Sequence, residues 1–256
     1  MTQAKNIFIT GGASGIGFGI AQSLAGDGHH VILADIDEQA AEKAAHVLSD
    51  KGLSASAVGI DVTDTQAVSA LPDKLSKTPV DILINNAGIQ HVSNLEAFPA
   101  DKWQQLINIM LVGPALLTQA FLPHMRAQNF GRIINVGSIH SLVASPYKSA
   151  YVSAKHGLLG LAKTVALEVG TADITINTLC PAYVKTPLVE KQIADQAKEN
   201  GISEEEVINE IMLKPMPKKA FISIEELAGT ARFLMSDSAR NITAQTMVLD
   251  GGWTAR

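Results

Sequence analysis

The feature that most constrains the fold is an alternation of short, nearly wholly apolar runs with longer segments of helical pattern. Apolar runs of this length are typical of strands buried on both faces, and helices between them indicate a parallel sheet covered on both sides. The pattern therefore predicts an α/β fold with a doubly wound parallel sheet, in a single Rossmann-type domain over 1–256. The predicted strands are 6–10, 31–34, 54–60, 80–84, 132–136 and 175–179, and the main predicted helices are 11–24, 38–48, 65–75, 101–126, a helix from 151 and 224–235.

Polar clusters follow the predicted strands at their carboxyl ends. In open parallel sheets, ligands bind beyond that edge. The clusters therefore predict one ligand site built from the glycine turn, Asp35, Asp61, Asn86, Ser138 and Thr186.

The segment 186–222 is long, charged and helical in pattern, with Pro187, Gly201, Pro215 and Pro217 as breakers. An insert of this kind beside a ligand site is typical of a mobile lid that closes over substrate. A helical hairpin packed on the body explains the same pattern, and both interpretations stay open at this point.

A glycine-rich turn follows the first strand and opens a helix. Gly11, Gly15 and Gly17 allow a tight turn and close approach of the backbone to a pyrophosphate, which the helix N-terminus favours. Asp35 stands eighteen residues beyond Gly17, where a carboxylate can accept hydrogen bonds from an adenosine ribose.

The same carboxylate would repel a 2′-phosphate, and Ala13, Ser14, Phe18 and Ile36 provide no compensating cation. We therefore expect NAD rather than NADP as cofactor. Asp61, before Val62, suits the adenine edge. Both aspartates have a structural alternative as helix N-caps.

Tyr151 and Lys155 are four residues apart at the start of a predicted helix and share one face. An ammonium near a phenol favours the phenolate and lowers the pKa of the tyrosine. Ser138 could hydrogen-bond the oxygen with which Tyr151 exchanges a proton. Tyr-x-x-x-Lys pairs are also common on helix surfaces, so the upstream cofactor site is what favours the catalytic interpretation.

Composition excludes several classes of function. The formal net charge is −5 and basic residues are not clustered, so we expect no nucleic-acid partner. No window looks long and apolar enough to span a bilayer, and the single cysteine, Cys180, indicates a core residue in a reducing cytoplasm. The histidines other than His140 show no metal-ligand spacing, so no metal site is predicted.

Together these residues resemble the short-chain dehydrogenase/reductase family over essentially the whole chain. The matching motifs are the run TGGASGIG from Thr10 to Gly17, the pair Asp61-Val62, the run NNAG from Asn85 to Gly88, Ser138, and Tyr151 with Lys155. The resemblance implies a seven-stranded Rossmann fold, a homotetramer, and cofactor contacts from Ser14, Ile16, Val62, Asn86, Ala87, Gly88, Pro181, Val184 and Thr186 besides the glycines, Asp35 and Asp61.

The resemblance also implies catalytic roles. Tyr151 would be the general acid/base, Lys155 would lower its pKa and hold the nicotinamide ribose, and Ser138 would orient the substrate oxygen. Two positions depart from the family pattern: Met110 stands where a catalytic asparagine is usual, and Ala182 follows Pro181 where glycine is usual. Met110 is therefore excluded from the predicted catalytic set.

A small anionic substrate is indicated by polar residues near the predicted centre. Two amides, an imidazole and an ammonium suit a carboxylate, and Trp253 could close the apolar side. The set resembles that of the family members acting on D-3-hydroxybutyrate, which implies NAD-dependent, reversible oxidation of (R)-3-hydroxybutyrate to acetoacetate. The predicted substrate residues are Gln90, His140, Lys148, Gln192 and Trp253.

Alternatives remain for this interpretation. His140 could be a structural loop residue, and Lys148 or Gln192 alone would be ordinary solvated side chains. A 3-oxoacyl thioester reductase of the same family would predict NADP and an open channel. A non-catalytic dinucleotide-binding scaffold is favoured only by Met110.

Overall fold

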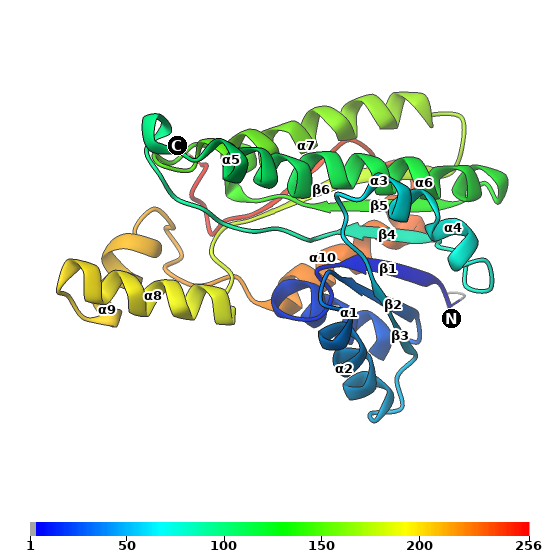
Figure 1. The fold of residues 1–256 in the computed structure, drawn as a ribbon, viewed down its shortest axis with the longest axis horizontal. Helices are drawn as coiled ribbons and strands as arrows, with labels where there is room; N and C mark the ends of the chain where they lie inside the picture. The colour runs from blue at the N-terminus through cyan, green and yellow to red at the C-terminus, as the bar shows by residue number, and fades with distance from the viewer. Residues whose placement is uncertain (1–3, 256) are drawn as a thin grey trace.

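A computed structural model describes residues 4–255 and contains one seven-stranded sheet in which every pairing is parallel. The strand order is β3-β2-β1-β4-β5-β6-β7, which confirms the predicted fold class (Figure 1). The strands are β1 Asn6–Thr10, β2 His30–Asp35, β3 Ala55–Gly59, β4 Ile82–Asn85, β5 Gly131–Val136, β6 Ile174–Pro181 and β7 Thr246–Leu249.

Helices cover both faces of this sheet. Figure 1 shows α5, α6 and α7 above the sheet and α1 and α2 below it. The helix α10 shares the core cluster of α1 and α2 on that lower face. The helices are α1 Gly15–Gly26, α2 Glu38–Ser49, α3 Thr65–Ser69, α4 Leu71–Lys74, α5 Ala100–Ile107, α6 Gly113–Ala127, α7 Ser149–Glu168, α8 Pro187–Asn200, α9 Glu204–Glu206 and α10 Ile224–Met235, with π-helices η2 Asn108–Val112 and η4 Val207–Met212 and 3-10 turns η1 Leu95–Ala97, η3 Ile139–Ser141 and η5 Asp237–Ala239.

The first strand shows why the sheet has two cores. Side chains alternate between the faces of a strand. Ile7 and Ile9 belong to the cluster shared with α1, α2 and α10, whereas Phe8 belongs to the cluster shared with α6 and α7. Because all three side chains are fully buried, the middle of the strand, Ile7–Ile9, is apolar at every position, as the sequence pattern indicated.

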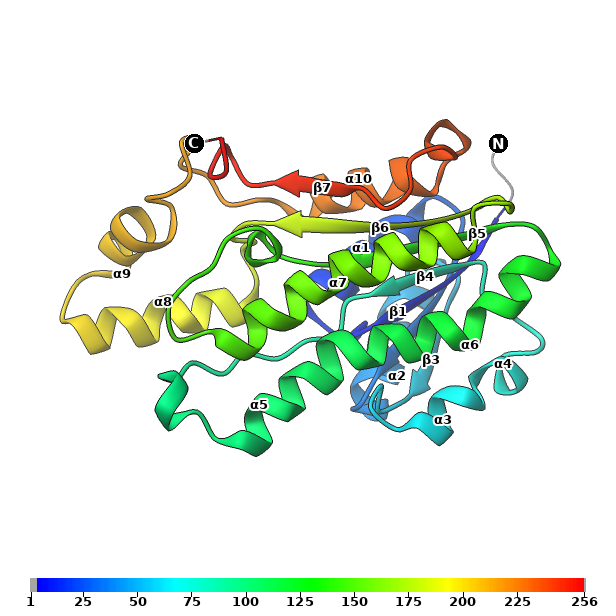
Figure 2. The same ribbon diagram turned by 90° about the horizontal axis from the view of Figure 1, so that it is seen from above.

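The longest helix corrects one expectation. α5, η2 and α6 run on as one helix of 28 residues, Ala100–Ala127, with a window of mean hydropathy 1.6. By length and composition alone it could span a bilayer, so the expectation that no window reaches that length is wrong. Its inward side chains, among them Leu106, Leu117 and Phe121, are buried in the protein, which is how the core helix of a globular domain packs (Figure 2).

Two further elements differ from the predicted ones. The helix expected over 65–75 is split into α3 and α4, because Pro72 stands in the first turn of α4 and cannot donate a backbone hydrogen bond. The strand β7 lies at the edge of the sheet and is only partly buried. Its apolar run, 247–249, is only three residues long, which is too short to stand out in the sequence.

The insert expected over 186–222 is a helical projection with a closed base. Val184 and Ile222 form a parallel bridge, and the amide of Ile222 donates to the carbonyl of Tyr183 at 2.9 Å. Ile193, Val207 and Met212 form a small core of their own within the insert. Figure 1 shows α8 and α9 projecting beyond the sheet on the side where the strands end.

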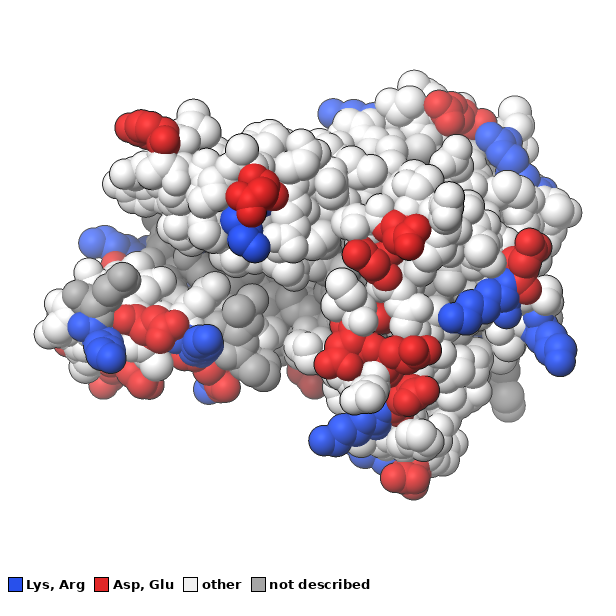
Figure 3. All heavy atoms as spheres, viewed as in Figure 1, with Lys and Arg blue, Asp and Glu red and all other residues white. Residues whose placement is uncertain are grey.

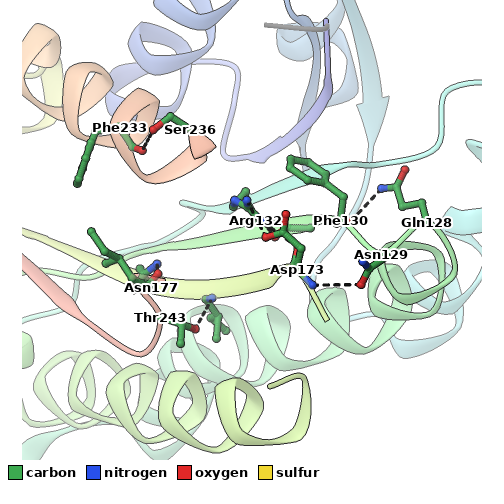
Figure 4. Close-up of polar contacts among 12 residues, drawn as sticks. Gln128, Asn129, Phe130, Arg132, Asp173, Asn177, Phe233, Ser236 and Thr243 are labelled. Carbon is green, nitrogen blue, oxygen red and sulfur yellow. Dashed lines mark hydrogen bonds and ion pairs between the residues drawn. The ribbon is translucent and has the colours of Figure 1, made fainter. Parts of the chain in front are cut away.

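The opposite, amino-terminal edge of the sheet holds a buried cation (Figure 4). Arg132, on β5, is fully buried, and its Nη2 lies 2.9 Å from Oδ1 of Asp173. Its Nη1 donates to the carbonyls of Gly131 and Asp173, both at 2.9 Å, and its guanidinium lies 4.5 Å from the ring centroid of Phe130. The protein itself therefore supplies the counter-charge, although Nε of Arg132 has no hydrogen-bond partner among the described residues.

Candidate active site

A cavity of about 540 Å³ opens at the carboxyl ends of the strands. It brings together all the predicted site residues except Gly17 and Trp253. The predicted residues that line it are Gly11, Ser14, Gly15, Ile16, Asp35, Asp61, Val62, Asn86, Ala87, Gly88, Gln90, Ser138, His140, Lys148, Tyr151, Lys155, Pro181, Val184, Thr186 and Gln192.

The glycine turn has the conformation that its sequence predicts. Gly11 and Gly15 have φ of +60° and +56°, which side chains rarely allow. A Cβ on Gly17 would lie 2.3 Å from the carbonyl oxygen of Gly11. Gly17 therefore serves the close packing of the turn on α1, not the lining of the cavity.

Asn86 ties this turn to the end of β4. Its side-chain amide donates to the carbonyls of Thr10 and Gly11, at 2.9 and 3.2 Å. The hydroxyl of Thr10 accepts from the amides of Asn86 and Ala87 in return. The two strand ends are thus held together by hydrogen bonds that involve no ligand.

The start of α1 fits a pyrophosphate. A Cβ on Gly15 would meet no atom within 4 Å, so there is open space above the turn. Ser14 is the N-cap residue and its side chain makes no capping hydrogen bond. The first amides of the helix and this hydroxyl can therefore receive an anion.

Asp35 and Asp61 are not the helix caps that the structural alternative required. The caps of α2 and α3 are Asp37 and Asp64, whose side chains accept from backbone amides of those helices. Asp35 instead accepts from the amide of Ala13 at 3.2 Å, which holds its carboxylate at the cavity wall.

This end of the cavity carries negative charge. Figure 3 shows acidic side chains gathered over the part of the face that β2, β3 and α2 occupy. Among the described residues, the cavity is lined by two basic side chains, Lys148 and Lys155, and both are at the opposite end, with Tyr151.

Ser138 follows β5 as the N-cap of the turn η3. Its Oγ accepts from the amide of His140 at 3.1 Å, and its extended backbone places it at the start of the turn. The turn therefore presents Ser138 and His140 to the same cavity.

Tyr151 and Lys155 lie one turn apart on α7, as predicted. The Nζ of Lys155 is 5.7 Å from the ring centroid of Tyr151 and donates to the carbonyl of Val136 at 2.7 Å. The expected lowering of the tyrosine pKa is wrong for the protein by itself. Burial raises the pKa of Tyr151, and hydrogen bonding from Ser138 partly opposes this rise. Burial also lowers the pKa of Lys155 to about 8.

Three polar side chains face the other part of the cavity without internal partners. Within residues 4–255, no hydrogen bond or ion pair engages the side chains of Gln90, Lys148 or Gln192, although each is half-buried. Burial lowers the pKa of Lys148. A half-buried ammonium without a counter-charge favours an anionic ligand.

His140 is buried beside these groups. Its Nδ1 lies 3.3 Å from the carbonyl oxygen of Val143, and its Nε2 lies 3.4 Å from the hydroxyl of Ser145. Burial first, and the charge of Lys148 next, lower the pKa of His140 to about 4. The imidazole is therefore neutral near pH 7.

Trp253 stands behind the cavity wall instead of on it. It lines a second recess with Leu142, Val143, Ile211, Lys214, Pro215 and Thr254. Its ring stacks on Tyr183, with centroids 6.0 Å apart, and meets the edge of His140 at 6.2 Å. Tyr183, which the sequence analysis missed, lines the cavity at the place expected for Trp253.

Met110 lies in the π-helix η2 and lines the cavity. Its Sδ would lie 3.3 Å from a Cβ built on Gly88, so the thioether packs against the turn that follows β4. Asn108 is engaged elsewhere, since its Oδ1 accepts from Gln104 at 2.8 Å. The position therefore provides no side-chain amide.

Comparison with known proteins agrees with this geometry. The family profile described as short chain dehydrogenase matches residues 5–197. The chain belongs to the short-chain dehydrogenase family. It is 45% identical to the D-beta-hydroxybutyrate dehydrogenase of Rhizobium meliloti, covering 98% of this chain and 99% of the relative.

Two further relatives of this short-chain dehydrogenase are similar over nearly their whole length. The D-beta-hydroxybutyrate dehydrogenase of Cupriavidus necator is 40% identical and covered completely, as is this chain. The uncharacterised oxidoreductase YxjF of Bacillus subtilis is 44% identical, with 97% of both chains covered.

Membership of the short-chain dehydrogenase family makes the protein an oxidoreductase of the alcohol dehydrogenase type that uses a nicotinamide dinucleotide. In the described part of the chain, no three histidine, cysteine, aspartate or glutamate side chains are grouped to hold a metal ion. Cys180 is a buried free thiol at the end of β6.

Proposed function

We propose that the protein catalyses the NAD-dependent, reversible oxidation of (R)-3-hydroxybutyrate to acetoacetate. The observation that carries this proposal is the half-buried Lys148, which no described residue pairs with and which shares a cavity with Tyr151, Gln90 and Gln192. Two relatives that cover nearly the whole chain bear the name D-beta-hydroxybutyrate dehydrogenase, which supports the same substrate.

The proton is handled by Tyr151. As the phenolate, Tyr151 accepts the proton of the substrate hydroxyl, and Ser138 donates a hydrogen bond to the same substrate oxygen. Lys155, held by the carbonyl of Val136, keeps positive charge near the phenol and the nicotinamide ribose. When bound, the oxidised nicotinamide supplies the acceptor for the hydride.

The carboxylate end of the substrate sets its orientation. The ammonium of Lys148 and the amides of Gln90 and Gln192 can each donate to a carboxylate oxygen. Fixing that end places carbon 3 near Tyr151, which is a positioning effect. Neutral His140 and the ring of Tyr183 border the remaining apolar part. Gln192 already lines the cavity from the insert, and closure of the insert over the substrate would exclude water.

NAD is favoured over NADP by the acidic end of the cavity. Asp35 stands at the wall with no lining cation near it, so a 2′-phosphate would meet unopposed negative charge. We further propose a homotetramer of cytoplasmic protein that acts on a small free acid.

The test is a comparison of substrates and cofactors with purified enzyme. We expect turnover of free (R)-3-hydroxybutyrate with NAD, and a much lower kcat/KM with NADP. Tyr151→Phe should lower kcat by roughly 10³-fold, because it removes the proton acceptor, and should leave NAD binding in calorimetry intact. A wild-type enzyme that binds NAD but oxidises no short 3-hydroxy acid would contradict the proposal.

Met110 favours one alternative of a different class, a dinucleotide-binding scaffold without catalysis. The same calorimetry and turnover measurements distinguish it, since the scaffold predicts NAD binding and no turnover. A 3-oxoacyl thioester reductase would instead prefer the thioester with NADPH. Trp253 lies outside the cavity and does not block an open channel, which leaves Asp35 as the feature that opposes that reductase.

A further inference from the structure

The turn η3 carries two functional groups on one short piece of backbone. Ser138 begins it and His140 lies within it, and both line the cavity. A turn of three residues has little stiffness of its own, so something outside the cavity must fix it. Ser141, the last residue of the turn, is 1% exposed and does not line the cavity.

Ser141 completes a reciprocal pair of hydrogen bonds with Ser138. The amide of Ser138 donates to Oγ of Ser141 at 3.2 Å, while Oγ of Ser138 accepts from the amide of His140 at 3.1 Å. This is a capping box closed by serine at both ends. Both bonds are buried, so water cannot replace a lost partner without rearrangement.

Cys180, on the neighbouring strand β6, lies behind the pair formed by Ser138 and Ser141. A Cβ on Gly137 would lie 2.8 Å from Oγ of Ser141 and 2.9 Å from Sγ of Cys180, so the two side chains meet beneath that glycine. Burial raises the pKa of the Cys180 thiol, while hydrogen bonding from Ser141 and from the backbone of Ser138 opposes the rise. The neutral thiol thus lies beside the Ser141 hydroxyl, which it can accept from.

We propose that Ser141, backed by Cys180, is a positioning residue that fixes the direction of the Ser138 hydroxyl toward Tyr151 and the substrate oxygen. The proposal rests on the function proposed above. A serine hydroxyl has one proton and two lone pairs. Because the amide of His140 occupies one lone pair and Ser141 holds the backbone of Ser138, the proton is left to point into the cavity.

The direction of that hydroxyl has a measurable consequence at Tyr151. Hydrogen bonding from Ser138 stabilises the phenolate and so lowers the pKa of Tyr151 against the effect of burial. The other titratable groups that face Tyr151 are Lys155 on its own helix, His140 on η3, and Cys180 and Tyr183 at and beyond the end of β6. Of these groups, the Cys180 thiol contacts Ser141, and loss of that contact would raise its pKa further and keep it neutral.

The experiment uses Ser141→Ala in the full-length enzyme, assayed as 3-hydroxybutyrate oxidation with NAD. We expect kcat to fall by roughly 10-fold to 100-fold, because the Ser138 hydroxyl loses its fixed direction. The rise of kcat with pH should shift to higher pH, because the phenolate loses support. The Kd for NAD should stay within about twofold of the wild type, since the glycine turn is untouched.

Thr178→Val is the matched control. Thr178 is fully buried, its Cγ2 would also meet a Cβ on Gly137, and its hydroxyl has no hydrogen-bond partner among the described residues. Removing this hydroxyl should leave kcat and the pH profile unchanged. A shift of the pH profile in Thr178→Val as large as that in Ser141→Ala would overturn the proposal.

A second variant changes Cys180, on β6, instead of Ser141. Cys180→Ala removes the sulfur beside the Ser141 hydroxyl and leaves η3 intact, so it should shift the pH profile in the same direction by a smaller amount. If Ser141→Ala and Cys180→Ala both keep the wild-type kcat and pH profile, the positioning role is overturned while the proposed function still stands. Failure of the wild type to oxidise any 3-hydroxy acid would instead refute the proposed function.

Discussion

Two cations at opposite edges of the same sheet differ in whether the protein itself provides their partners. Arg132, at the amino edge, is fully buried, paired with Asp173 and hydrogen-bonded to two backbone carbonyls. Lys148, at the carboxyl edge, is half-buried, and no described residue pairs with it. A partly buried charge without a partner is costly, so a folded protein keeps one where a ligand supplies the partner.

The comparison separates stability from function. Where the protein supplies the counter-charge, as Asp173 does for Arg132, the interaction contributes to the folded state without any ligand. Where the protein leaves donors open, as at Lys148, Gln90 and Gln192, the missing acceptor belongs to the substrate. The carboxyl edge therefore gives up some stability to gain binding.

The largest effect should come from breaking the amino-edge pair. Asp173→Ala leaves the buried charge of Arg132 with backbone acceptors alone, so we expect a loss of about 3 kcal/mol in the free energy of unfolding by urea titration. The KM for 3-hydroxybutyrate should stay unchanged. The control is Asp27→Ala, which breaks the exposed pair with Arg232 and should cost less than about 1 kcal/mol.

Lys148→Ala should show the reverse of Asp173→Ala, with weaker substrate use and unchanged stability. Loss of a charged donor should lower kcat/KM for 3-hydroxybutyrate by roughly 10-fold to 100-fold, mainly through KM. The free energy of unfolding should not fall, because no partner in the protein is lost. Lys185→Ala, at an exposed lysine that pairs with Glu190, is the control. Equal weakening of NAD and substrate by Lys148→Ala would show that the carboxylate is bound elsewhere.

Much of the carboxyl edge could be predicted from sequence, because parallel strands end together and their next residues must meet. Asp35, Asn86, Ser138 and Tyr151 were each found from that rule or from motif spacing, and the structure places them on one cavity. Gly17 fails the same rule, since the glycine serves close packing against Gly11.

The parts that sequence did not reveal depend on packing across long separations. Tyr183 takes the wall position expected for Trp253 because the C-terminal turn brings the indole behind it, and no spacing rule relates the two. The edge strand β7 has an apolar run of only three residues, 247–249, so the seventh strand came from the family resemblance alone. Likewise, the π-helix around Met110 has no signature in the apolar pattern of that long helix.

A third prediction concerns His140, whose buried imidazole should make the stability of the carboxyl edge depend on pH. Its pKa in the folded protein is about 4, against 6.5 for an unperturbed histidine such as that of the unfolded chain. Between these values the unfolded chain binds more protons, so stability rises with pH and is lost as pH falls from 6.5 toward 4. We expect a loss of about 2 kcal/mol between pH 7 and pH 5 from this group. Urea titrations of His140→Asn at both pH values should show a correspondingly weaker pH dependence, whereas an unchanged dependence would assign it to other groups.

Gln192→Ala should have the smallest effect, and it tests whether the insert contributes to substrate binding. Gln192 lines the cavity from α8, and its amide has no partner within residues 4–255. Gln192→Ala removes one neutral donor to a carboxylate, so we expect KM for 3-hydroxybutyrate to rise by roughly 3-fold to 10-fold with NAD binding unchanged.

Gln196→Ala is the control for that variant, because Gln196 lies one turn further along α8 and does not line the cavity. If both variants raise KM equally, the insert acts through its packing on the body, as an ordinary helical hairpin would. If Gln192→Ala alone raises KM, the insert contributes a donor to the carboxylate, and its closure over the substrate is part of binding.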